Sequence, residues 1–157
     1  MQKLLVIAAC IVLAGCSHLS KKAVVGTVEF DTSLTRFSTL TGIYHQDMCA
    51  NRVSDARVHL SNSEMRSILA LADKSGFYRA PADLTTDWSD SDKPPHCATF
   101  RLHIESGGKH NEVRWDCRRN GSNEPPLVVA PLVLQIQKIL HSKPEVRALP
   151  WSSCSVH

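Results

Sequence analysis

Several common features are missing from this 157-residue sequence, and each absence narrows its class. The charges nearly cancel, with 18 Lys and Arg against 15 Asp and Glu, so the chain lacks the strong positive excess of a nucleic-acid-binding protein. No apolar run approaches the roughly 20 residues that a membrane-spanning helix needs. The absence of an internal repeat and of a sustained heptad pattern excludes a solenoid and a long coiled coil.

The familiar sequence motifs of catalysis are missing as well. The chain contains no Gly-x-Ser-x-Gly elbow, no His-Glu-x-x-His helix and no Gly-rich phosphate loop. His45 with Cys49, and His96 beside Cys97, lack further ligands at the spacing of a zinc site. We therefore predict no metal, no cofactor and no catalytic residue.

Two polar clusters are explained better by structure than by chemistry. Asp87, Asp90 and Asp92 occupy a polar loop at 83–95, but Gly and Glu are absent from the positions where an EF-hand loop requires them. A solvated acidic loop is the simpler interpretation, and its length makes it the candidate functional loop. The run Trp-Asp-Cys-Arg-Arg at 115–119 predicts a core tryptophan beside a solvated charge cluster.

The clearest positive signal lies at the N-terminus. Lys3 precedes an apolar stretch at 4–14, and this stretch closes with Leu-Ala-Gly-Cys at 13–16. The apolar stretch is too short for a transmembrane anchor, and the polar residues 17–22 follow it at once. The layout resembles the signal peptide and lipobox of bacterial lipoproteins.

The resemblance implies a cleaved signal peptide at 1–15 and a lipid on Cys16, which becomes the first mature residue. In the family, the thiol takes a diacylglycerol and the new amine is usually acylated, and two or three acyl chains hold a protein durably at a bilayer. The residue after the lipidated cysteine is Ser17 rather than the Asp typical of inner-membrane retention, which favours the outer membrane. Residues 16–22 then form a lipidated tether, whose six residues after the cysteine span at most about 20 Å.

Four cysteines remain in the mature chain: Cys49, Cys97, Cys117 and Cys154. An even number in an oxidising compartment predicts two disulfide bonds, for which three connectivities exist. We favour Cys97 with Cys117, which bracket an expected hairpin, and Cys49 with Cys154, which would tie the C-terminal tail to the domain. If residue 102 pairs with 113, Cys97 falls opposite residue 118, so a bulge or a frayed strand end must absorb the mismatch.

We expect residues 23–157 to form one globular domain of the α+β class. We expect a small antiparallel sheet of about five strands, at 23–31, 35–45, 52–60, 98–105 and 110–116. Two helices should pack on this sheet, and the chain order is strand-strand-strand-helix-strand-strand-helix. The first helix should run over 62–75, with Ser61 and Glu64 as a capping box and Gly76 as its stop. The second should begin near Pro131 and end before Pro144.

These features favour a non-enzymatic binding module, anchored in the outer membrane with its domain in the periplasm. Its expected partners are the membrane, through the acyl chains, and another envelope protein, with no nucleic acid. Two alternatives stay open. One is an envelope hydrolase without a visible motif, which needs a cleft joining His45, His96 or an Asp to a hydroxyl nucleophile. The other is a carrier of a small or lipidic ligand, which needs an apolar cavity of several hundred Å³, on the order of known ligand pockets.

Overall fold

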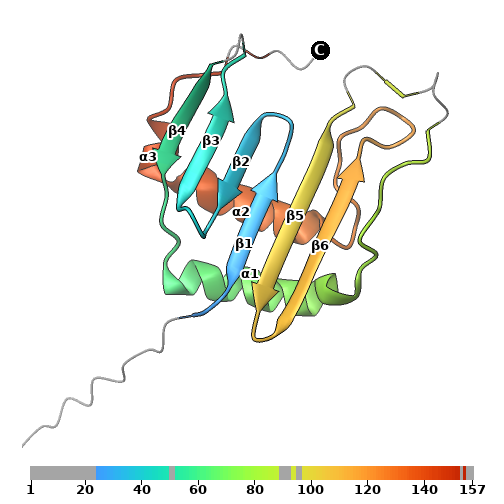
Figure 1. Cartoon of the computed structure of the whole chain (residues 1–157), viewed down its shortest axis with the longest axis horizontal. Helices are drawn as coiled ribbons and strands as arrows, with labels where there is room; N and C mark the ends of the chain where they lie inside the picture. The colour runs from blue at the N-terminus through green and yellow to red at the C-terminus, as the bar shows by residue number, and fades with distance from the viewer. Residues whose placement is uncertain (1–23, 50–51, 89–92, 95–96, 153, 155–157) are drawn as a thin grey trace, which may run out of the picture.

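The structure is a computed structural model, and it describes residues 24–49, 52–88, 93–94, 97–152 and 154 (Figure 1). The predicted signal peptide 1–15, the predicted tether 16–22 and Cys16 itself lie outside the described residues. Within the described part, no helix is both long enough and apolar enough to cross a membrane.

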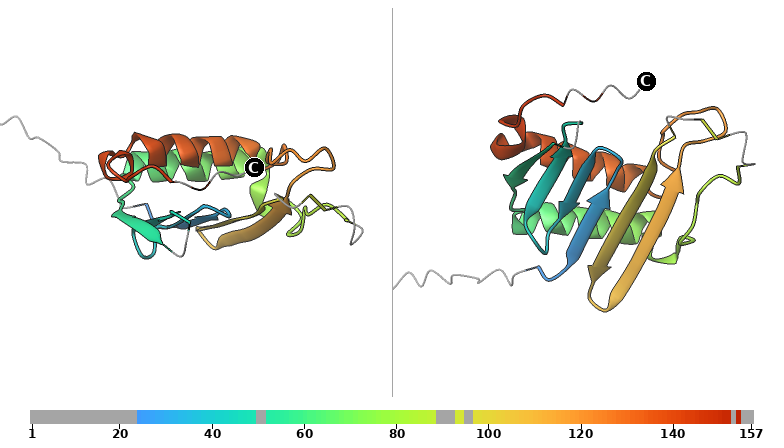
Figure 2. Two further views of the ribbon diagram at one scale, coloured as in Figure 1. Left: turned by 90° about the horizontal axis from the view of Figure 1, so that it is seen from above. Right: turned by 45° about the horizontal axis from the view of Figure 1, so that its top comes forward.

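A six-stranded antiparallel sheet forms one layer of the domain, in the spatial order β4-β3-β2-β1-β5-β6. Its strands are β1 Thr27–Asp31, β2 Thr35–Ser38, β3 Ile43–Asp47, β4 Val53–Arg57, β5 Thr99–Ser106 and β6 Lys109–Asp116. The helices cover one face of the sheet (Figure 2), and they are α1 Asn62–Ser75, the 3-10 turn η1 Phe77–Arg79, α2 Ala130–Ser142 and the short α3 Pro144–Arg147. The predicted α+β class is confirmed.

Alternation along the strands creates the core. In β1, Val28 and Phe30 are buried while their neighbours are partly exposed. Because side chains alternate between the two faces of a strand, one face of the sheet is apolar and packs against the helices. The buried residues of the other strands include Phe37, Tyr44, Ala56, Leu102, Ile104, Val113 and Trp115.

The predicted single strand at 35–45 is in fact a hairpin, β2 and β3, so the sheet has six strands. Phe37 and Tyr44 are both buried, yet residues seven apart in one continuous strand would point to opposite faces. The turn between them makes them direct cross-strand partners on the buried face. Gly42 permits this turn with a φ of 64°, and its N–H donates to the Ser38 carbonyl at 2.9 Å.

Helix α1 has the predicted bounds because its ends are specified locally. The Ser61 side chain accepts from the backbone N–H of Glu64, and the Glu64 side chain accepts from the Ser61 N–H, which completes the capping box. Gly76 ends the helix in the left-handed conformation, with a φ of 75°.

Helix α2 also follows its prediction. It begins at Ala130 with Pro131 in the first turn, where a missing N–H costs no helical hydrogen bond. The residues that it buries form an apolar stripe at helical spacing: Leu132, Val133, Ile136, Ile139 and Leu140. Pro144 then opens α3 rather than extending α2.

The disulfide bonds are Cys49–Cys154 and Cys97–Cys117, the pairing that the sequence favours. Leu102 pairs with Val113, so the register that creates the predicted mismatch is the observed one. Both Cys97 and Cys117 lie just outside the ladder, which spans Thr99–Ser106 and Lys109–Asp116. The irregular backbone beyond the strand ends therefore absorbs the one-residue offset.

The two ends of the strands differ in what they carry (Figure 1). One end, the tether end, holds the start of β1, the turn at 39–42 and the β5–β6 turn at 107–108. The other, the loop end, holds both disulfides and the connecting residues 32–34, 82–88, 93–94, 97–98 and 117–129. Thr27 pairs with Glu105, and the six residues from there back to Thr99, where β5 begins, correspond to about 20 Å of strand.

Candidate functional site

The predicted functional loop folds back onto the edge strand β6. Leu84 donates its N–H to the Arg114 carbonyl at 2.8 Å, and Arg114 donates its N–H to the Ala82 carbonyl at 2.8 Å. These two bonds form an isolated parallel bridge at Asp83. The loop thereby covers part of the sheet edge at the loop end.

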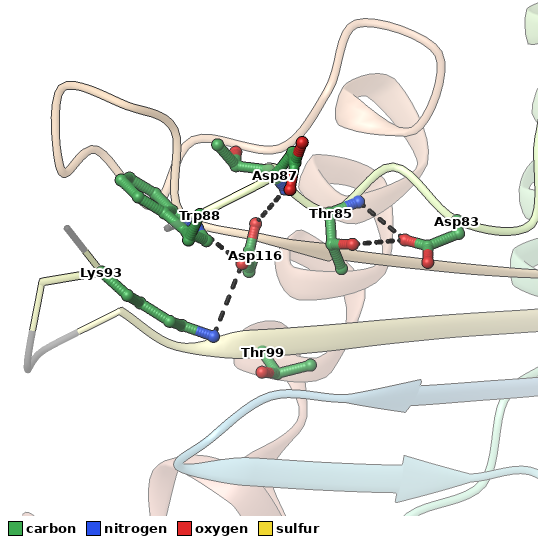
Figure 3. Close-up of a pocket in the computed structure, with 8 residues that line it drawn as sticks. Asp83, Thr85, Asp87, Trp88, Lys93, Thr99 and Asp116 are labelled. Carbon is green, nitrogen blue, oxygen red and sulfur yellow. Dashed lines mark hydrogen bonds and ion pairs between the residues drawn. The ribbon is translucent and has the colours of Figure 1, made fainter. Parts of the chain in front are cut away.

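Asp116, at the end of β6, fixes this loop in place (Figure 3). The residue is only 5% exposed, yet it points toward the loop and receives three contacts from it. Thr86 donates its backbone N–H at 2.7 Å, the Trp88 indole Nε1 donates at 2.9 Å, and the Lys93 Nζ lies 3.5 Å away. A buried carboxylate needs such donors, because an unpaired charge in the interior is strongly destabilising.

Further side chain to backbone bonds complete the scaffold. Thr86 donates its hydroxyl to the Cys117 carbonyl at 2.9 Å, and Arg119 donates to the Asp87 carbonyl at 3.0 Å. The pKa of Asp83 lies below its ordinary value because Thr85 donates to the carboxylate from its hydroxyl and its backbone N–H. These bonds hold Asp83, Thr86 and Asp87 in place within the described part of the loop.

A polar hollow of about 740 Å³ opens over this loop, and Figure 3 shows the side chains that line it. The carboxylates of Asp83 and Asp116 are both occupied by hydrogen bonds within the chain. Asp87, Trp88 and Lys93 also line this hollow, and the buried acid Asp116 serves as a structural acceptor.

This corrects one expectation from the sequence. Trp115 is a core residue, as predicted, with 1% exposure, but Asp116 is buried instead of belonging to a solvated charge cluster. The physical reason is that residues 82–88 and Lys93 cover the outward face of the last residue of β6. The strand pattern places Asp116 on the uncovered face and gives no signal that a loop will return to it.

His45 is brought together with an acid and several hydroxyls. Its Nδ1 lies 2.6 Å from Asp55 Oδ1, since the two residues are cross-strand partners on β3 and β4. A hollow of about 430 Å³ is lined by this pair and by Thr32, Ser33 and Thr35. The hydroxyls of Thr32 and Thr35 lie 3.0 Å apart and interact with each other, and no hydrogen bond joins His45 to a hydroxyl among the described residues.

The metal hypotheses find no support at the cysteines. Asp47, Cys49 and Cys154 place one oxygen and two sulfurs within 4.8 Å of one another, but those sulfurs form a disulfide and are not thiolate ligands. The hairpin strands β5 and β6 carry two further histidines, His103 and His110, whose direct cross-strand partners are Glu112 and Glu105. Of the other candidate ligands, His96, Asp90 and Asp92 lie outside the described residues.

The uncovered face of the sheet carries a network of charges that the sequence analysis missed. Arg101 on β5 lies 3.4 Å from Glu29, 3.7 Å from Asp31 and 3.2 Å from Glu112. Burial acts to lower the pKa of Arg101, but these carboxylates outweigh it and the pKa is raised. The pKa of Glu112 is lowered by hydrogen bonds from Arg114 and Arg101, against the opposing effect of burial. Opposite charges compensate one another on this part of the face.

No protein-family model matches this chain, and no curated protein matches it. A functional proposal therefore starts from the arrangement of its own residues.

Proposed function

We propose that this protein is an outer-membrane lipoprotein whose periplasmic domain binds another envelope protein through its loop end. Its role is non-enzymatic. The proposal rests on the difference between the two ends of the strands. The chain enters the domain at one end, while both disulfides stabilise the opposite end. An anchor attached before β1 would hold the tether end toward the bilayer and leave the loop end accessible.

The rigidity of the loop end supports a binding role. Ordering a flexible loop on binding reduces affinity, so a loop that is already fixed loses less conformational entropy. Asp116, the Cys97–Cys117 disulfide and the Arg119 contact fix this loop without using the exposed side chain of Asp87. That side chain and the partly buried ring of Trp88 are available to a partner.

The anchor is tested by the substitution Cys16→Ser. The wild-type protein should incorporate radiolabelled palmitate and fractionate with outer membranes, and the variant should lose both properties. Labelling that persists in the variant would overturn the lipobox assignment. Labelled protein in the inner-membrane fraction would overturn the sorting prediction.

The binding role is tested by pull-down of the epitope-tagged, lipidated protein from solubilised envelopes. We expect one dominant protein partner, whose recovery falls at least tenfold with Asp87→Arg at the loop end. Glu105→Arg makes the same charge change at the tether end and serves as the matched control. Equal loss with both variants, or recovery of lipid alone, contradicts the proposal.

The hydrolase alternative has one observation in its favour, the hollow that holds His45, Asp55 and Ser33. Its test is release of soluble fragments from purified peptidoglycan and of fluorophore from an acyl ester. His45→Ala should abolish any such activity, and His103→Ala, on the same sheet face, should leave it unchanged. Absence of turnover in the wild-type protein removes this alternative.

A further inference from the structure

A further hollow at the loop end, the aromatic groove, lies on the helix-covered side of the sheet. Its volume is about 400 Å³. Phe100 and Trp115 line it from the sheet, Val133 and Gln137 from α2, and Asn123 from the connection before α2. It is separate from the polar hollow over the loop, which shares none of these residues.

The sheet side of the groove is a stacked aromatic pair. Phe100 and Trp115 are direct cross-strand partners, and their rings lie 5.4 Å apart between centroids at an interplanar angle of 6°. Phe30 of β1 also lines the groove. Flat rings and aliphatic side chains together favour a flat, largely apolar occupant.

Among the described residues, two buried polar side-chain atoms of groove-lining residues have no hydrogen-bond partner. One is the indole Nε1 of Trp115, a donor on a residue with 1% exposure, and the other is Oδ1 of Asn123, an acceptor. Buried polar atoms are paired in the great majority of cases, so each unpaired atom is a cost to the folded chain. Here the two atoms are opposite in kind and belong to the same groove.

The charge of the occupant follows from the lining. Among the described residues that line the groove, the charged one is Glu124, and its side chain is 72% exposed. The described lining therefore offers no buried charge that could pair with a charged ligand. We infer that the aromatic groove binds a small, planar, uncharged molecule that carries both a hydrogen-bond acceptor for Trp115 Nε1 and a donor for Asn123 Oδ1. Aromatic and heterocyclic amides belong to this class.

Entry requires a small rearrangement, because both polar atoms are shielded from solvent. Asn123 lies in an irregular segment, and its Oδ1 accepts no hydrogen bond from the described residues, so a shift of this segment is the rearrangement that binding would use. This inference does not rest on the proposed protein-binding role, and it gives the carrier alternative a specific site.

The test uses the mature lipidated chain in lipid nanodiscs, with ¹⁵N-labelled tryptophan and three probes. Benzamide offers an acceptor and a donor, acetophenone offers the acceptor alone, and benzoate is charged. We expect saturable shifts of the Trp115 indole N–H with benzamide, about tenfold weaker binding of acetophenone, and no saturable binding of benzoate. The indole signals of Trp88, already bonded to Asp116, and of exposed Trp151 should not move.

Variants separate the site from general partitioning. Trp115→Phe keeps a ring but removes the donor, and the signal lost in this variant identifies the Trp115 resonance. It should weaken benzamide binding about tenfold, whereas Trp151→Phe should leave it unchanged. Asn123→Leu removes the acceptor and is the second test if Trp115→Phe is unstable. Unchanged benzamide affinity in a folded variant at position 115 or 123, or equal affinity for benzamide and acetophenone, overturns the inference.

Discussion

The two ends of this domain are closed by different means. At the tether end, short turns suffice, and Gly42, Gly107 and Gly108 adopt the positive φ values that these turns require. At the loop end, long connections are held by a buried carboxylate at Asp116 and by two disulfides. Local backbone preferences close the first end, and contacts between distant segments close the second.

This difference between the two ends predicts where substitutions destabilise the fold most. A turn that depends on one glycine loses little when that residue changes, because only a few dihedral angles are affected. A loop that depends on one anchor loses all the contacts the anchor organises. We therefore expect substitutions at the loop end to cost more free energy of unfolding than substitutions at the tether end.

The largest expected effect is removal of a disulfide by paired Cys→Ser substitution. The Cys49–Cys154 bond has a sequence separation of 105 residues and Cys97–Cys117 one of 20. The chain-entropy model then gives losses of about 4.7 and about 3 kcal/mol in the free energy of unfolding. Urea unfolding without reductant measures both. Mass spectrometry should first show four fewer hydrogens in the native protein than in its reduced form, and free thiols there would refute the expectation.

Next in size is Asp116→Ala, which leaves the Thr86 N–H and the Trp88 indole without their acceptor. We expect a loss of about 2 kcal/mol in the free energy of unfolding, with faster hydrogen exchange at the Thr86 amide. Asp87→Ala is the control, because its exposed side chain is not part of this cluster. If both variants unfold at the same urea concentration, Asp116 does not anchor the loop.

At the tether end, Glu64→Gln should cost about 1.5 kcal/mol at neutral pH. Burial acts to raise the pKa of Glu64, but hydrogen bonds from Lys143, at 2.8 Å, and from Ser61 outweigh it and the pKa is lowered. Because the pKa of Glu64 is lower in the folded state, its ionised carboxylate stabilises the protein at pH values above the unfolded-state pKa, about 4.3. This stabilisation is lost as the pH falls through the folded-state pKa. Denaturation curves of both proteins should therefore converge in acid. If the difference in unfolding free energy between the wild type and Glu64→Gln stayed constant down to the lowest pH, the ionised Glu64 carboxylate would be excluded as its cause.

The smallest effect is expected from Gly108→Ala in the β5–β6 turn. An added Cβ meets no atom within 4 Å, so the cost comes from the φ of 78° alone, about 1 kcal/mol. Gly26→Ala offers a useful contrast, because its Cβ would lie 2.9 Å from the Glu105 carbonyl oxygen and force the backbone to shift. Thermal denaturation should rank Gly26→Ala as the more destabilising of the two. The reverse order would mean that backbone conformation outweighs contact at this end.

Features with local causes were predictable. The capping box at Ser61 and Glu64 and the stop at Gly76 specify helix α1 within a few residues, and the stripe on α2 follows from its periodicity. The hairpin at 35–45 was missed because Phe and Tyr suit a continuous strand as well as two short ones. Only pairing of Phe37 with Tyr44 on one buried face reveals the turn.

The candidate sites were less predictable because they join distant parts of the chain. Asp116 binds residues 28 and 30 positions away, and no local pattern marks it as the anchor of the loop. Trp115 is recognisable as a core residue, but the groove that it lines together with Asn123 depends on how the connection before α2 packs over the sheet, and so do the unpaired Nε1 and Oδ1 of these two side chains. Cys49, with a φ of 59°, likewise adopts a left-handed backbone that its residue type does not suggest.

The local sequence determined the helix bounds, the glycine turns and the alternation of buried and exposed residues in the strands. Each of these features depends on residues within about one helical turn or one hairpin of each other. The N-terminal lipobox remains a sequence-based prediction of the same local kind. Burial of Asp116 and formation of the aromatic groove were decided by tertiary structure, because each arises where separate segments meet. A side chain has no fixed environment until the segment that covers it has been placed.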